Sequence, residues 1–150
     1  MDVLGSNRLA RALSPSFKAG VNVLEAAFLD PGTRVLYEDW DLVAAEAVAG
    51  LRASAGARIN DPRLRELVDH LSGSSDDFAR LWARHDVLPK VGGTRLIRHP
   101  LVGLMELRHE KLAVSGSGGQ VLVLHHAEPG TSSAEAFARL AAAAAENGDD

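Results

Sequence analysis

The sequence contains no cysteine, few aromatic residues and no long apolar run, and each of these absences excludes a class of protein. Without cysteine there are no disulfides, zinc ribbons, iron-sulfur clusters or thiol nucleophiles. Two Trp, one Tyr and four Phe leave few rings for stacking a flavin or a nucleotide. An aliphatic cavity closed by Trp could still be built, because it requires few aromatic residues. No segment approaches the roughly 18 apolar residues of a membrane span, and the N-terminus lacks a signal-peptide pattern, so a cytoplasmic protein is expected.

The charge balance argues against direct binding of nucleic acid. The formal net charge is -4, and binding of phosphates needs an excess or a patch of Lys and Arg. A chain of 150 residues is long enough to bury a core of its own. We expect one domain over residues 1–145, followed by a polar tail at 146–150.

The hydrophobic period changes along the chain from helical to extended, which predicts an α+β fold with segregated helices and sheet. We expect an antiparallel three-stranded meander, in which Met105, Leu107 and His109 face inward. The apolar Val121–Leu124 run predicts a central strand covered on both faces, and Asp2–Leu4 is a candidate fourth strand. Asp30-Pro31-Gly32 is typical of a turn, and capping boxes are expected at Ser74 with Asp77 and at Ser132 with Glu135. The expected helices cover 7–13, 22–29, 39–54, about 61–72, 74–85 and a segment from 132, and the expected strands cover 94–98, 102–114 and 120–127.

Six histidines do not form a local metal motif. His125 and His126 are adjacent on an expected strand and face opposite sides, so they cannot chelate one ion. A zinc site of His85, His99 and His109 has no local signature, and structural roles are favoured. The glycine-rich segments 92–94 and 116–119 adjoin strands and fit turns, not phosphate loops. We therefore expect no metal and no cofactor.

Five sequence strings, taken together, resemble the MmyB-like ligand-binding domain of helix-turn-helix transcription regulators of the xenobiotic-response-element class, a family common in actinobacteria. The resemblance covers about Asp2 to Leu140. It implies a PAS-like fold, with an antiparallel sheet, helices packed over one face and a small-molecule cavity between them. It also implies that the DNA-binding helix-turn-helix domain is missing from this chain. The strings are 7–13 (NRLARAL), 28–31 (FLDP) followed by 39–40 (DW), 81–87 (LWARHDV), 99–103 (HPLVG) and 127–131 (AEPGT).

The resemblance suggests a non-catalytic sensor of a small lipophilic or fatty-acid-like metabolite that modulates DNA binding. Relatives often have Lys where this chain has Arg95, and Tyr where it has His109. A mostly apolar pocket needs a few placed polar groups to orient a ligand, and Arg95 suits a carboxylate. The regulator role also predicts a homodimer. The expected ligand-binding residues are apolar at Phe28, Trp40, Trp82, Met105, Leu107 and Val123, and polar at Asn7, His85, Arg95 and His99.

Two alternatives from other classes remain open at this stage. One is a small enzyme that uses His85 or His109 with Asp86 or Glu110 as an acid-base pair. The other is a protein-interaction module whose cavity is filled by its own side chains. A polar cavity with a His near a carboxylate would favour the enzyme, and a solid interior behind Trp40 and Trp82 would favour the interaction module.

Overall fold

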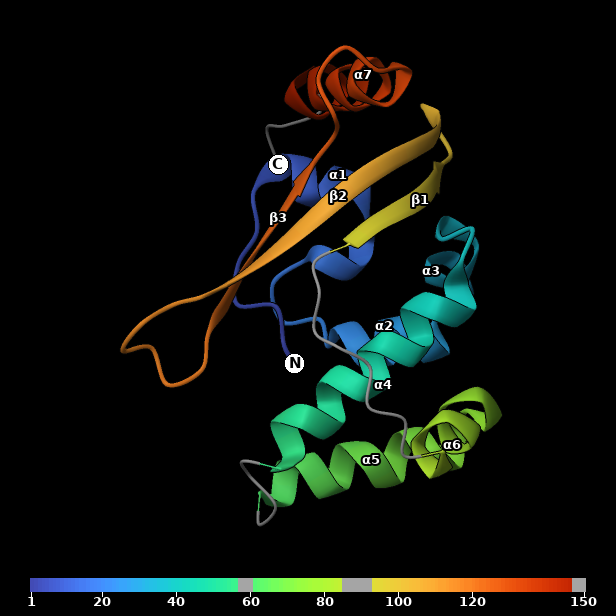
Figure 1. Ribbon diagram of the computed structural model, residues 1–150, viewed down its shortest axis with the longest axis vertical. Coiled ribbons are helices and arrows are strands. Elements are labelled where there is room, and N and C mark those ends of the chain that lie inside the picture. The colour runs from blue at the N-terminus through green and yellow to red at the C-terminus, as the bar shows by residue number, and fades with distance from the viewer. Residues whose placement is uncertain (57–60, 85–92, 147–150) are drawn as a thin grey trace.

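The computed structural model describes residues 1–56, 61–84 and 93–146, and within them it has an α+β fold, as predicted (Figure 1). Helices α1 to α6 come first, a three-stranded sheet follows, and α7 comes last. A 3₁₀ turn, η1, follows α1. The bounds are α1 Arg8–Leu13, η1 Pro15–Phe17, α2 Val23–Leu29, α3 Pro31–Leu36, α4 Trp40–Gly56, α5 Pro62–Ser74, α6 Asp76–Ala83, β1 Gly93–His99, β2 Gly103–Ala113, β3 Val121–His126 and α7 Ser132–Glu146.

Side-chain caps set the start of most helices. The Asn7 side chain accepts from the amide of Ala10, and the Asn22 side chain caps α2 in the same way. Asp61 caps α5, with Pro62 at the first helical position, where its missing N–H costs nothing. These three starts are confirmed, because an N-cap depends on neighbouring residues alone.

Three other local predictions were wrong. Asp30 caps a helix, α3, where a turn was predicted, because Pro31 fits the first helical position. Ser75 caps α6, since Ser74 is still the last residue of α5. Thr131 caps α7: its hydroxyl accepts from the amide of Ala134 at 3.1 Å.

The sheet is an antiparallel meander in the order β1-β2-β3, as predicted. β3 is therefore an edge strand, and the prediction that Val121–Leu124 is a covered central strand was wrong. An apolar run is equally compatible with an edge that extends past the core. The Asp2–Leu4 segment makes one isolated bridge, Asp2 with Asn22, and does not join the sheet.

The interior is divided into two apolar clusters. One lies among α2, α4, α5 and α6 and contains the large aromatic rings, and the other lies between the inner face of the sheet and α1, α3 and α7. The first cluster is built on Leu24, Trp40, Ala44, Val48, Leu51, Leu71, Phe78 and Leu81, and the second on Leu13, Leu36, Ile97, Met105, Leu107, Ala136 and Leu140.

Candidate ligand-binding site

The inner face of the sheet is apolar in its middle and polar at both ends. Met105 and Leu107 of β2 are fully buried, as their alternation with Glu106 and Arg108 predicted. In the antiparallel register, Leu107 lies opposite Arg95, so Arg95 projects from the same face. A ligand at this face would meet aliphatic side chains beside an arginine.

At one end of this face, His99 has a structural role. Its side chain is buried, its Nε2 lies 2.9 Å from the carbonyl oxygen of Ala12, and its Nδ1 accepts from the amide of Leu101 at 3.2 Å. This pattern places the proton on Nε2, which donates to Ala12. Both ring nitrogens are therefore engaged, which leaves His99 with little capacity to hold a ligand. Asn7 is likewise committed to the cap of α1 and is exposed.

At the other end, Arg95 and His109 lie together over Gly93. A Cβ atom built on Gly93 would come within 3.1 Å of an Nη1 atom of Arg95 and within 3.5 Å of the Cε1 atom of His109. The Arg95 side chain is only 11% exposed and pairs with Glu46 of α4, whose side chain is 31% exposed. His109 is buried, and its Nδ1 has no hydrogen-bond partner among the described residues. We call Arg95, His109 and Glu46 the polar seam.

Burial favours the neutral form of His109 in the polar seam and of His125 beside it. Desolvation lowers the pKa of His109, and the positive charges of Arg95 and Lys111 lower it further. His125, opposite His109 on β3, has a pKa lowered to about 4, mainly by burial. Burial also raises the pKa of Tyr37, against the opposing effect of Arg95. With His109 neutral, the polar seam has the guanidinium of Arg95 paired with the carboxylate of Glu46, and an anionic head group could bind this guanidinium only in place of Glu46.

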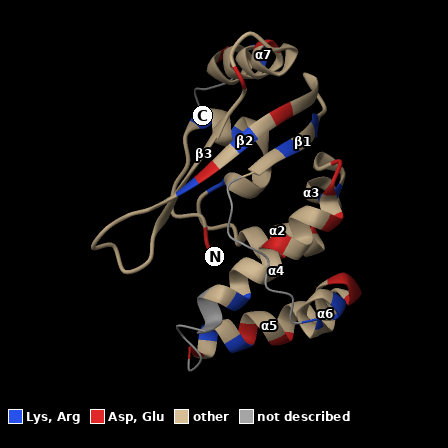
Figure 2. Ribbon diagram, in the orientation of Figure 1, with Lys and Arg blue, Asp and Glu red and all other residues tan. Residues whose placement is uncertain are grey.

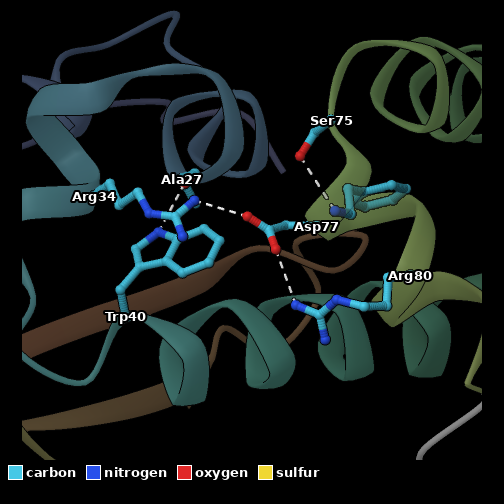
Figure 3. Close-up of polar contacts among 7 residues, drawn as sticks. Ala27, Arg34, Trp40, Ser75, Asp77 and Arg80 are labelled. Atoms are coloured by element: carbon cyan, nitrogen blue, oxygen red, sulfur yellow. Dashed lines mark hydrogen bonds and ion pairs between the residues drawn. The ribbon is translucent and has the colours of Figure 1, made fainter.

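The aromatic residues predicted to line the cavity pack against one another in the helical cluster. The Phe28 ring contacts Trp40 and Phe78 edge-on, with centroids 5.8 and 5.2 Å apart, and Trp82 stacks on Phe78 at 5.8 Å. The Trp40 Nε1 donates to the carbonyl of Ala27 at 3.0 Å (Figure 3). These rings support the helical layer.

The structure thus distributes the predicted ligand-binding residues over several places. Met105, Leu107 and Arg95 share the inner face of the sheet, whereas Phe28, Trp40 and Trp82 belong to the helical cluster. Val123 is 44% exposed on the hairpin beyond the core. His85 lies outside the described residues. Sequence reasoning missed Glu46, and the one available signal was a charged residue flanked by the apolar positions of α4.

Asp77 of α6 pairs with Arg34 of α3 and with Arg80 of its own helix (Figure 3). Their guanidinium hydrogen bonds lower the pKa of Asp77, so this contribution to stability is present above pH 4 and is lost as the pH falls through the lowered pKa. We expect Asp77→Asn to reduce the free energy of unfolding by about 1 kcal/mol at pH 7, and the difference from wild type to disappear in acid. Urea unfolding at pH 7 and at successively lower pH values measures this. Asp76→Asn, an exposed neighbour in the same helical turn, is the matched control; an equal loss there would indicate a helix-dipole effect instead.

An open depression of about 570 Å³ lies where α4 begins. Its size would suit a small ligand. However, Glu38, Asp39 and Asp41 line it together with Arg34, and this excess of carboxylates disfavours an acidic ligand. For an acidic ligand, the polar seam is the better candidate.

The described residues do not form the acid-base pair of the enzyme alternative. His109 faces inward and Glu110 outward, where its Oε1 lies 3.9 Å from Nε2 of His126. His85 and Asp86 lie outside the described residues. Within residues 1–56, 61–84 and 93–146, no group of three His, Asp or Glu side chains is arranged to hold a metal ion. In the same ranges no helix has the length and apolar character needed to cross a membrane.

Comparison with known families identifies the family of this chain. The family described as the MmyB-like transcription regulator ligand binding domain matches residues 1–141. The chain belongs to this family. No curated protein matches it. An MmyB-like domain is the ligand-binding part of a transcription regulator, which implies a small-molecule ligand and a DNA-binding partner domain.

Proposed function

We propose that this MmyB-like domain is a non-catalytic sensor of a fatty-acid-like metabolite, acts in the cytoplasm and controls the DNA binding of a helix-turn-helix domain. The observation that carries the ligand class is Arg95, a nearly buried guanidinium on the aliphatic inner face of the sheet. Arginine binds a carboxylate through two parallel N–H bonds. Beside it, the Nδ1 of His109 has no hydrogen-bond partner among the described residues and could bond a second oxygen.

Glu46 supplies a carboxylate to Arg95 in the structure described here, so an acidic ligand must take its place. The exchange replaces one carboxylate by another on the same guanidinium and frees α4 from β1, because Glu46 belongs to α4 and Arg95 to β1. A ligand shifts a conformational equilibrium only if it binds one state more tightly. Here the two states would be Arg95 paired with Glu46 and Arg95 paired with the ligand.

The test is to detect a ligand and to compare an acid with its alcohol. Native mass spectrometry of protein purified from cells, followed by denaturation, should reveal an aliphatic acid. After removal of lipid, dodecanoate should bind at least tenfold more tightly than dodecanol in calorimetric titration, because the two differ only in the head group that meets Arg95. Equal affinity for the two would rule out the carboxylate site.

The interaction module is the second candidate, and the packed ring cluster favours it. The Phe78 ring contacts the rings of Phe28 and Trp82, and Met105 and Leu107 have no exposed surface. A protein that purifies without lipid and binds neither dodecanoate nor dodecanol would support this candidate over the sensor.

A further inference from the structure

The hairpin of β2 and β3 extends past the rest of the sheet (Figure 1). β1 begins at Gly93, opposite His109, so from Glu110 to the tip the described sheet has two strands. A two-stranded hairpin is marginally stable in water without further packing. Among the described residues, this part of the molecule therefore has no third strand that would stabilise it.

Both faces of the projecting β3 are apolar and exposed. Val121, Leu122, Val123 and Leu124 are between 44% and 53% exposed, and β3 contains no Asp, Glu, Lys or Arg. Figure 2 shows the strand and the hairpin tip without charged residues. Monomeric proteins protect edge strands with charges, proline or a covering segment, and β3 has neither charge nor proline.

The loop that joins the two strands is ordered by specific hydrogen bonds. The Ser117 hydroxyl donates to the carbonyl of Val114 at 2.7 Å and accepts from the amide of Gln120 at 3.0 Å. Gly116 and Gly118 adopt positive φ angles of 74° and 71°, which glycine tolerates without strain. The exposed hairpin is thus a defined structure that can present a fixed edge.

The opposite edge of the sheet is covered within the chain. Tyr37 makes an antiparallel bridge to Ile97 of β1, and the amide of Glu38 donates to the carbonyl of Leu96 at 3.1 Å. Among the described residues, no equivalent segment covers β3. The two edges differ, and within the part of the chain that the structure describes only the edge of β3 is open to another strand.

We propose that β3 pairs antiparallel with β3 of a second copy, across a two-fold axis at Val123. A strand partner bonds the free backbone edge and places its own apolar side chains beside those of β3 on each side of the sheet. The Val123 register places Leu122 against Leu124 of the partner subunit and keeps each paired residue from 121 to 125 within β3. A second copy fits because the strand has no charge to repel its own image. This surface is independent of the proposed ligand.

Because the chain has no cysteine, a single introduced thiol tests both the partner and the register. Val123→Cys should form a disulfide-linked dimer at least tenfold faster than Val35→Cys when both are oxidised with copper phenanthroline. Val35 is the matched control, an exposed valine on α3. Light scattering of the unmodified protein should show a dimer that dissociates on dilution, and Leu122→Lys with Leu124→Lys should shift the protein to monomer.

Circular dichroism keeps the test valid by showing whether each variant is folded. A monomer at all concentrations up to 1 mM overturns the proposal. So does equal crosslinking of the two cysteine variants. A dimer that persists in the folded double lysine variant would place the interface elsewhere.

Discussion

Phe78→Ala should lower the free energy of unfolding by about 3–5 kcal/mol, the largest loss of stability we expect from any single change in the helical cluster. The Phe78 side chain has no exposed surface and contacts the rings of Phe28 and Trp82. Its removal leaves a cavity and disrupts both ring contacts. The eight-residue α6 is too short to be stable alone and depends on this packing.

Urea unfolding followed by tryptophan fluorescence measures this loss, since Trp82 stacks directly on the deleted ring. Two controls separate packing from hydrophobicity. Phe78→Leu keeps most of the volume and should cost less than half as much. Phe137→Ala, at a half-buried position in the sheet cluster, should also cost less. A loss below 1 kcal/mol for Phe78→Ala would show that the neighbouring helices close around the cavity.

Local features of the fold could be predicted from the sequence because they depend on neighbouring residues. The helix starts at Asn7, Asn22 and Asp61 are of this kind. The inward orientation of Met105 and Leu107 follows from strict alternation on one strand. The exact first residue of a helix is harder to predict where two neighbouring residues could both act as the cap. Ser74 and Ser75 both precede α6, and the sequence did not indicate which of them is the cap.

Features that depend on distant partners could not be predicted in this way. Four successive apolar residues in β3 are compatible with a buried centre or an exposed edge, and only the strand order distinguishes the two. Arg95 could be named as a head-group residue from its chemistry, but its pairing with Glu46 joins residues 49 positions apart. The same holds for the aromatic residues, whose separate cluster is set by how α2, α4 and α6 pack.

Arg95→Met should weaken dodecanoate binding by about 10- to 100-fold and leave dodecanol binding unchanged, because hydrogen bonds to charged groups contribute about 1.5–3 kcal/mol. Methionine keeps the length of the side chain and removes the charge. Arg98→Met is the matched control on the same strand: Arg98 faces outward and pairs with Glu38, so its loss should leave both affinities unchanged. Isothermal calorimetry on lipid-free protein measures all of these constants.

Glu46→Gln should have the opposite effect on the same ligand. It removes the internal carboxylate that competes for Arg95, so dodecanoate should bind more tightly than to wild type while dodecanol binds as before. The two variants together separate competition from packing: a site in which Glu46 only supports α4 would lose affinity for the acid and the alcohol alike. If Glu46→Gln weakens dodecanoate binding selectively, the carboxylate assists the ligand, and the exchange at Arg95 is wrong.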